Sequence, residues 1–253
     1  MVKSLGFLFS RLGWLPPLIL LSGCGKGYDW GWYVVSPFHP QGLTNIQFLI
    51  SGLGYTLQLS FMAILLSIVL GLLVALLTLT KHPFPRRVNR IYVESFRSIP
   101  ILVMLLWVYY GLPPAFGIRL DVLWAGVLAL AICDSAFEAE IFRAGIQSIE
   151  RGQHDAADSL GLGFILKMRL IVLPQAIKRI LPAIGNQFVY MLKMSSLVSV
   201  IGMTELTRRA DELVVSQYRP LEIYTFLVLE YFLLIIVVSS LVRWAERKLQ
   251  TDV

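Results

Sequence analysis

Charged residues and metal-binding side chains are scarce in this sequence. Only 15% of its 253 residues are charged, whereas 57% are hydrophobic, and the mean hydropathy is +0.71. An ordinary soluble domain carries more charge and less apolar surface. The composition therefore excludes a typical soluble globular protein and indicates a chain that is embedded in a lipid bilayer.

Cysteine and histidine are too few and too scattered to build a metal centre. The two cysteines are Cys24, near the N-terminus, and Cys133, inside an apolar run, and the three histidines are His39, His82 and His154. A disulfide framework, a thiolate site or a histidine cluster needs several such residues at defined spacings. We expect no metal site and no disulfide framework.

Motifs for catalysis and nucleotide binding are also missing. The chain has no Gly-x4-Gly-Lys-Ser/Thr phosphate loop, because Gly25-Lys26 is followed by Gly27, and it has no His-Glu-x-x-His or Gly-x-Ser-x-Gly motif. We therefore expect no enzyme activity and no cofactor held by this chain. Energy for any transport must come from a partner.

Basic residues lie in short clusters between apolar runs. The net charge is +6, but the clusters form no continuous basic face. This pattern is typical of loops that set membrane topology. We expect no nucleic-acid partner.

The apolar runs predict five membrane-spanning helices. A hydrocarbon core of about 30 Å needs about 20 helical residues at about 1.5 Å each. The second run is short and is expected to extend backwards to Tyr92, with Glu94 and Arg97 paired on one helical face. Pro113-Pro114 is expected to begin a loop. The predicted spans are 53–79, 99–112 with its extension, 123–142, 181–203 and 224–244.

The predicted topology places the N-terminus outside and the C-terminus in the cytoplasm. The cytoplasmic segments are then 80–98, 142–180 and 243–253, and they carry twice as many Lys and Arg as the external segments. Such an excess is typical of the cytoplasmic side. Residues 25–52, with several Trp and Tyr, are expected to be extracytoplasmic or interfacial, and 53–253 to form the membrane domain.

Residues 1–24 have the features of a targeting segment. Lys3 and Arg11 precede an apolar run, 15–21, that is too short to span a bilayer. The run leads into Leu-Ser-Gly-Cys24, which resembles the lipobox of bacterial lipoproteins, whose cysteine is lipidated after cleavage. Two alternatives stay open: lipidation of Cys24, or an uncleaved segment that lies on the membrane.

A polar-to-amphipathic stretch, 150–176, interrupts the apolar sequence on the cytoplasmic side. Asp155 and Asp158 are expected in the first turns of a short helix, where carboxylates suit the positive end of the helix dipole. Gly161 is expected to end that helix and to let a second one start at a sharp angle, with Pro174 as its far boundary. The sequence thus predicts two short helices joined by glycine.

The spacing within this stretch resembles the EAA loop of ABC-importer permeases, EAA-x3-G-x9-I-x-L-P. The only departure is aspartate in place of glutamate at the first position, which keeps the carboxylate and shortens its reach. The resemblance implies that this loop couples the permease to its ATPase. The residues that carry it are Asp155, Ala156, Ala157, Gly161, Ile171, Leu173 and Pro174.

Sequences on both sides of the loop resemble the polar amino acid permeases, the histidine, glutamine, glutamate and arginine group. The resemblance covers about residues 50–250, with its most specific motifs in 92–111, 140–153 and 173–206. It implies an all-α integral membrane protein with the type I ABC importer permease fold in the bacterial inner membrane. The implied function is movement of polar amino acids into the cytoplasm.

The resemblance also implies partners. A second permease subunit, identical or different, would complete the pathway, and a cytoplasmic ABC ATPase dimer would bind ATP and magnesium. An extracytoplasmic amino acid-binding protein would deliver the substrate. The chain itself also contacts membrane lipid.

Polar side chains inside the predicted spans are candidates for the substrate path. A zwitterionic amino acid needs an acceptor for its ammonium and donors for its carboxylate, and intramembrane ionisable or amide residues supply them. Lys193 has the alternative of pairing with a carboxylate across spans. The candidates are Asp134, Glu138, Asn186, Lys193, Ser195, Thr56 and Gln58, of which Asp134 lies deepest in its span.

Other functions compete with this interpretation. Within the same class, an opine or a sulfur-containing amino acid is the alternative substrate. A secondary transporter or ion channel that uses intramembrane carboxylates should show an inverted repeat in place of the EAA spacing, and we find no such repeat in the predicted spans.

Overall fold

The computed structural model describes residues 28–80 and 82–250, and its regular elements there are all helical. Cys24 and the segment 1–24 lie outside the described residues. Contacts divide the chain into two units, 1–32 and 33–253. In the described part of the first unit, the rings of Trp30 and Trp32 stack with centroids 6.1 Å apart.

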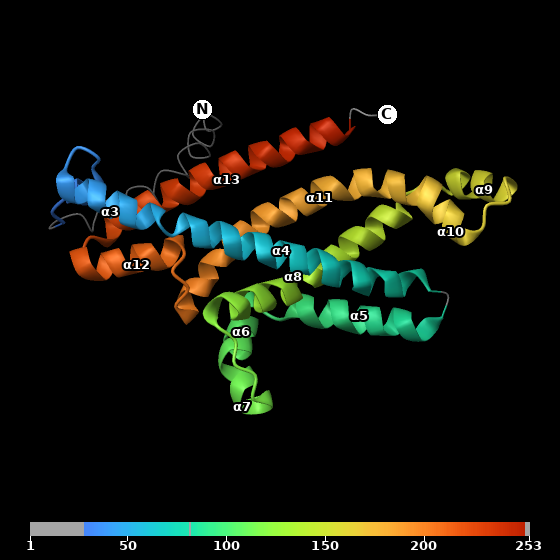
Figure 1. Ribbon diagram of the computed structural model, residues 1–253, viewed down its shortest axis with the longest axis horizontal. Helices are drawn as coiled ribbons and strands as arrows, with labels where there is room; N and C mark the ends of the chain where they lie inside the picture. The colour runs from blue at the N-terminus through green and yellow to red at the C-terminus, as the bar shows by residue number, and fades with distance from the viewer. Residues whose placement is uncertain (1–27, 81, 251–253) are drawn as a thin grey trace, which may run out of the picture. The chain divides into compact units, whose positions relative to one another are not determined.

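Helices α3 to α13 all belong to the second unit (Figure 1). The α-helices are α3 (Pro40–Ile50), α4 (Leu53–Leu76), α5 (Pro83–Ser98), α6 (Ile101–Leu106), α7 (Leu112–Phe116), α8 (Val122–Gln147), α9 (Arg151–Ser159), α10 (Phe164–Lys167), α11 (Leu173–Met194), α12 (Leu206–Gln217) and α13 (Pro220–Gln250). The 3-10 and π segments are η2 (Trp32–Val35), η3 (Leu77–Leu79), η4 (Trp107–Gly111), η5 (Met168–Val172) and η6 (Ser195–Ile201).

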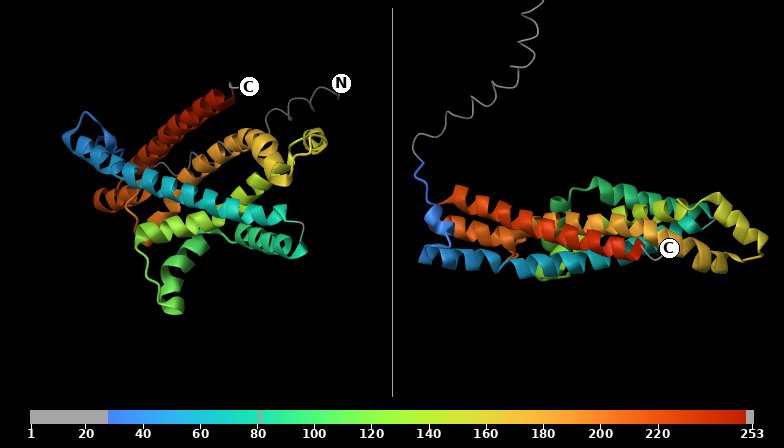
Figure 2. Two further views of the ribbon diagram at one scale, coloured as in Figure 1. Left: turned by 45° about the vertical axis from the view of Figure 1, so that its right-hand side comes forward. Right: turned by 90° about the horizontal axis from the view of Figure 1, so that it is seen from above.

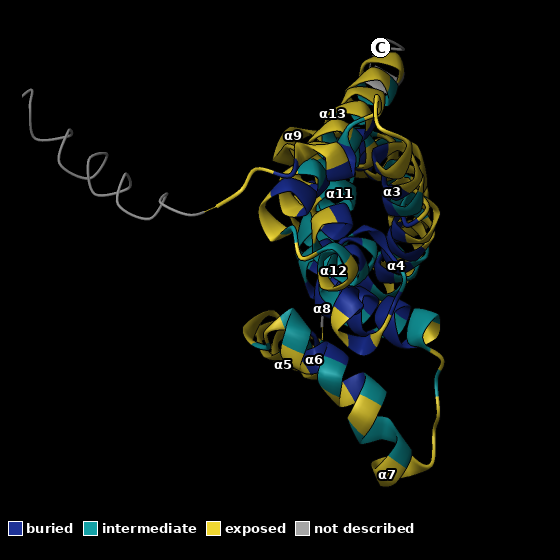
Figure 3. Ribbon diagram, turned by 90° about the vertical axis from the view of Figure 1, so that its left-hand side faces the viewer, coloured by how far each residue is buried: buried dark blue, intermediate teal, exposed yellow. Residues whose placement is uncertain are grey.

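The packing of α4 along α8 forms the centre of the second unit, and Figure 3 shows buried residues concentrated on these two helices. Small residues recur at intervals of three or four along the buried face of α4, which lets two helix backbones approach closely. These residues are Thr56, Ser60, Ala63, Ser67, Gly71 and Ala75. A Cβ placed on Gly71 would lie only 2.5 Å from the Cβ of Glu138 on α8.

The segments expected in the cytoplasm lie toward one end of the second unit (Figures 1 and 2). The turn from α4 to α5 and the short helices α9 and α10 are at this end, and α13 runs toward it. Helices α3 and α12 lie at the opposite end. The positive charges predict that the end with α9 and α10 is cytoplasmic.

Three helices in the described residues are long and apolar enough to cross a membrane, and a fourth span results if the bent pair α5 and α6–α7 counts as one. The three are Pro40–Leu76, Val122–Gln147 and Pro220–Lys248. The predicted fourth span, 181–203, corresponds to α11 and the 3-10 segment η6. Although α11 has 22 residues, its amide and basic side chains lower its hydropathy, and it is not among these three helices.

The second predicted span is not one straight helix, so that prediction is wrong in its geometry. The two arms, Pro83–Ser98 and Ile101–Phe116, meet at 97°. Pro100 has no N–H to continue α5 and restricts the residue before it, and Ile99 is indeed extended, with φ −87° and ψ 125°. The expected ion pair between Glu94 and Arg97 is absent among the described ion pairs.

Two proline boundaries predicted from the sequence also differ. Pro113-Pro114, predicted to begin a loop, lies in the first turn of α7. Pro174, predicted to be the boundary of the second short helix, lies in the first turn of α11. In each case a π segment ends just before the Leu-Pro pair. The wider π turn accommodates a proline ring and the unpaired carbonyl that precedes it, so the helical path continues.

Candidate functional site

A glycine in the left-handed conformation joins the helices of the predicted coupling segment, which we call the Gly161 loop (residues 151–172). Gly161 has φ +70°. Its N–H donates to the carbonyl of Asp158 at 3.0 Å, and the N–H of Leu162 donates to that of Ala157 at 3.1 Å. This pair of bonds is a Schellman motif, which ends α9 and needs positive φ after the C-cap. The predicted glycine joint is therefore present.

An ion pair connects the two helices on either side of Gly161. Lys167 Nζ on α10 lies 2.6 Å from Asp158 Oδ1 on α9. The positions of the carboxylates differ from prediction, because α9 begins at Arg151 and has no acidic residue in its first turn. Asp155 and Asp158 lie in its middle and last turns. Asp158 therefore does not interact with the N-terminal end of the α9 dipole. It forms an ion pair with Lys167 of α10 instead.

The Gly161 loop exposes large apolar side chains. Leu160, Phe164 and Ile165 are 76%, 62% and 78% exposed. Ala157 is fully buried, whereas Asp155 is exposed. Ala156 is exposed as well, Ile171 is half-buried in the π segment, and Leu173 and Pro174 are exposed at the start of α11. An exposed apolar surface of this kind is typical of a site that contacts another protein or a membrane.

A buried polar group, which we call the Asp134 cluster (Asp134, Glu138, Ser67 and Gln187), lies between α4, α8 and α11. Ser67 Oγ donates to Asp134 Oδ2 at 2.6 Å, and Gln187 Nε2 donates to Asp134 Oδ1 at 2.7 Å. Asp134 is 2% exposed. Both carboxylate oxygens therefore accept hydrogen bonds from neighbouring helices, and this carboxylate links three elements.

Glu138 lies one helical turn after Asp134 and has no such partners. It is fully buried, and neither carboxylate oxygen has a hydrogen-bond partner. A buried acceptor without a donor is costly unless a ligand, a proton or a conformational change satisfies it. The two carboxylates that the sequence predicts together are together in the structure, but their environments differ.

The other predicted path residues lie apart from the Asp134 cluster. Thr56 is buried and accepts from the N–H of Leu206 at 3.2 Å, and Ser195 is buried and donates to the carbonyl of Leu192 at 2.7 Å. Both hydroxyls serve helix packing. Asn186, Lys193 and Gln58 are exposed on this chain, and Lys193 is in none of the described ion pairs.

Sequence reasoning missed the two donors of the cluster. Ser67 belongs to the small-residue pattern of α4, a signal that places it on the face toward α8. Gln187 is adjacent to the predicted Asn186, and residues one apart point about 100° apart on a helix. The choice between the two amides therefore depends on the rotation of α11.

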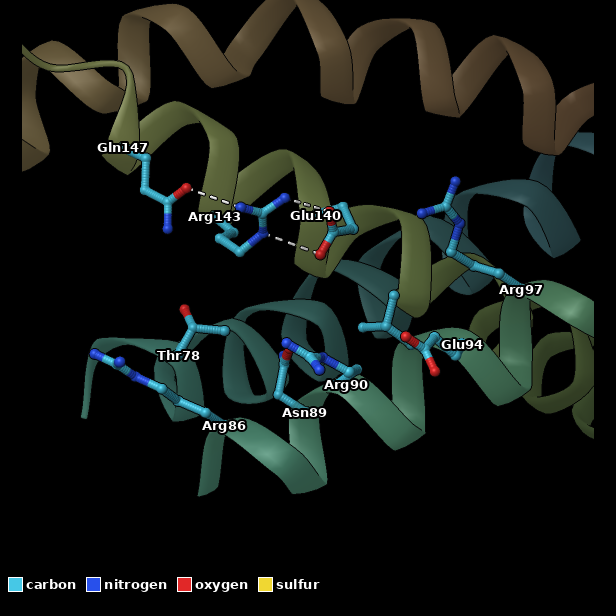
Figure 4. Close-up of a pocket in the computed structure, with 10 residues that line it drawn as sticks. Thr78, Arg86, Asn89, Arg90, Glu94, Arg97, Glu140, Arg143 and Gln147 are labelled. Atoms are coloured by element: carbon cyan, nitrogen blue, oxygen red, sulfur yellow. Dashed lines mark hydrogen bonds and ion pairs between the residues drawn. The ribbon is translucent and has the colours of Figure 1, made fainter. Parts of the chain in front are cut away.

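A polar cavity of about 490 Å³ lies between α5 and the last turns of α8 (Figure 4). Four arginines and two glutamates line it. Arg143 forms two bonds to Glu140, at 3.1 and 2.6 Å, and one to Gln147 at 2.8 Å. The cavity lies toward the end of the second unit that also holds the Gly161 loop.

The model of one protein family, described as the binding-protein-dependent transport system inner membrane component, matches residues 67–251. The chain belongs to this family. The match includes the Asp134 cluster and the whole Gly161 loop, so the predicted relationship to ABC-importer permeases is confirmed. The predicted all-α membrane fold is confirmed with it.

Individual relatives of this permease are known. It is 40% identical to the probable glutamine ABC transporter permease protein GlnM of Bacillus subtilis, over 81% of this chain and 95% of the relative. It is 35% identical to the arginine transport system permease protein ArtQ of the same organism, over 83% and 96%. A solved chain from an amino acid ABC transporter with histidines is 43% identical, with a TM-score of 0.77 and coverage of 81% and 96%.

Proposed function

We propose that this permease moves polar amino acids into the cytoplasm as one half of the transmembrane pathway of an ATP-driven importer. Relatives named for glutamine and arginine transport support the substrate class. The observation that carries the mechanism is the Gly161 loop, whose hinge geometry and exposed apolar side chains suit docking to another protein. A second permease subunit, identical or different, completes the pathway.

Energy comes from a cytoplasmic ATPase dimer that binds ATP and magnesium, while this chain holds no cofactor and performs no hydrolysis. The Gly161 loop sits in a groove of that ATPase. Helices α8 and α11 flank the loop, so a rigid-body movement of the loop reaches both helices directly. Asp134 and Gln187, which are bonded to each other, lie on these same two helices.

The chain lies in the bacterial inner membrane with its N-terminus outside and its C-terminus in the cytoplasm. The excess of Lys and Arg on the Gly161-loop side supports this orientation. An extracytoplasmic binding protein delivers the amino acid at the other side. Within the membrane, Asp134 and Glu138 are the proposed acceptors for its ammonium group.

Reconstitution of the complete importer in proteoliposomes tests this function. Wild-type complex should accumulate radiolabelled L-glutamine or L-arginine only when ATP is present with the ATPase. Ile165→Glu places a charge in the proposed docking surface and should reduce co-purification of the ATPase by about tenfold or more. Phe84, which is 76% exposed at the start of α5, provides the matched control Phe84→Glu, with normal co-purification expected.

Two results would contradict the proposal. Equal ATPase binding by the Ile165→Glu and wild-type complexes would remove the Gly161 loop from the docking surface. Uptake that follows an ion gradient without ATP would favour a secondary transporter.

A further inference from the structure

Two cavities of opposite character meet at Arg97. The polar cavity of about 490 Å³ includes Arg97 in its wall, on the same side as Arg90 and Glu94 (Figure 4). A second cavity, of about 360 Å³, also includes Arg97, but the rest of its lining is almost entirely apolar or aromatic, with Ile99, Leu102 and Phe137 among its residues. Both volumes fall within the range of about 300–1,000 Å³ that is typical of small-molecule sites.

The bend at Pro100 positions Arg97 at this boundary. Arg97 is in the last turn of α5, and Ile99, two residues later, is the extended residue at which the chain turns by 97°. The same bend places Ile101 and Leu102 of α6 in the wall of the apolar cavity. Its opposite walls come from α8 and α11, through Phe137 and Tyr190.

The exposed side chain of Arg97 lies over an aromatic ring and forms none of the described ion pairs within 4.0 Å, although its charge acts on Glu140 at longer range. Its Cζ lies 5.0 Å from the ring centroid of Phe137. None of the described ion pairs within 4.0 Å includes Arg97, whereas Arg143 in the same polar cavity forms a two-bond pair with Glu140. A guanidinium on an aromatic face keeps its N–H edge free, and that edge suits two-bond recognition of a carboxylate.

We propose that Arg97 binds the α-carboxylate of the transported amino acid at the boundary between the two cavities. The apolar cavity holds the aliphatic part of the substrate, and the polar cavity is the exit toward the cytoplasm. This inference rests on the proposed import of amino acids, and it makes the carboxylate, common to all such substrates, the group that the permease recognises. Arg97 is thus a residue of the substrate path that the sequence-based candidates did not include.

Competition binding to the solubilised permease–ATPase complex, without the binding protein, tests the proposal. The labelled ligand is whichever of L-arginine and L-glutamine the wild-type importer transports. The competitors are that amino acid and its analogue without the carboxyl group, agmatine or 4-aminobutanamide. In the wild-type complex the amino acid should compete at least about tenfold better than the analogue, as the loss of a charge-assisted contact predicts.

Variants on one helix separate recognition from structure. In Arg97→Gln the amino acid and its carboxyl-free analogue should compete equally. Arg97→Lys should retain part of the preference, because lysine keeps the positive charge but lacks the two parallel N–H donors of the guanidinium. Arg90→Gln removes the same charge from α5 two turns earlier, in the wall of the polar cavity alone, and should keep the wild-type preference.

The outcomes distinguish this inference from the proposed function. An undiminished preference for the amino acid in both Arg97 variants, or no preference in the wild-type complex, would overturn the role of Arg97 while leaving import intact. A wild-type importer that transports neither amino acid would overturn the proposed function, and the Arg97 inference with it.

Discussion

Gly71 and Gly161 lie in two regions that need glycine for opposite reasons. At the α4–α8 interface there is no space for a side chain, because a Cβ on Gly71 would lie 2.5 Å from the Cβ of Glu138 and 3.0 Å from the backbone of Ala139. In the Gly161 loop there is space, since nothing lies within 4 Å of an added Cβ, but the backbone has φ +70°. One glycine permits close packing and the other permits a turn.

The two regions also differ in which side chains are buried and which charged groups are paired. Around Gly71, small and apolar side chains are buried, and one of two enclosed carboxylates lacks a partner. In the Gly161 loop, the charges of Lys167 and Asp158 are paired and the large apolar side chains are exposed. At the α4–α8 interface Glu138 is the buried carboxylate without a hydrogen-bond partner, whereas the Gly161 loop leaves its large apolar side chains exposed on this chain.

Gly71→Val should produce the largest effect. Overpacking typically costs about 1–3 kcal/mol, and the approach to backbone atoms of α8 places this substitution at the upper end or beyond. We expect the yield of folded permease and its melting temperature in detergent to fall sharply. Gly54→Ala is the matched control on the same helix, because nothing lies within 4 Å of its added Cβ and alanine favours helix. Equal loss in both variants would contradict close packing at Gly71.

Asp134→Ala should have the second largest effect. It leaves the buried hydroxyl of Ser67 and the half-buried amide of Gln187 without this acceptor, at a cost of about 1–3 kcal/mol. Uptake by proteoliposomes should fall about tenfold, while co-purification of the ATPase should stay normal because the Gly161 loop is untouched. Unchanged uptake kinetics would remove Asp134 from the path.

Glu138→Gln sharpens the contrast inside the Asp134 cluster. The substitution removes an enclosed charge that has no partner while keeping the shape of the side chain, so the melting temperature should stay the same or rise. If Glu138 accepts the substrate ammonium, uptake falls although stability does not. A loss of stability equal to that of Asp134→Ala would mean that Glu138 has an unseen structural partner.

The sequence predicts the Gly161 loop better than it predicts the helix interior. The conformation of the loop depends on the spacing of neighbouring residues, whereas contacts in the interior depend on how each helix is rotated about its axis. The glycine hinge follows from a pattern of nearby residues, and its positive φ confirms it. The bend at Pro100 has a local cause too, but its angle of 97° depends on what α6 packs against. The selection of Gln187 over Asn186 depends wholly on tertiary packing.

Gly161→Val should reduce coupling without a steric clash. A left-handed conformation costs a non-glycine residue about 1–2 kcal/mol, and more for a β-branched one, so the loop should reorient and substrate-stimulated ATP hydrolysis should fall about fivefold to tenfold. Gly161→Asn is the matched control, because asparagine tolerates positive φ, and it should retain coupling within about twofold. Equal coupling in the two variants would mean that the loop does not need this backbone conformation.

Lys167→Met should produce the smallest effect, and this limit is informative. The side chain of Asp158 is 58% exposed and that of Lys167 is 16% exposed, so solvent screens this pair through Asp158. Exposed ion pairs contribute about 0.2–1 kcal/mol and weaken in salt, and we expect this pair to lie near the upper end of that range. Coupled ATP hydrolysis should change by less than about threefold at low ionic strength and should approach the wild-type value in high salt. A larger, salt-independent loss would show that Lys167 contacts the ATPase itself, because a charge buried in an interface is screened far less than this partly exposed pair within the loop.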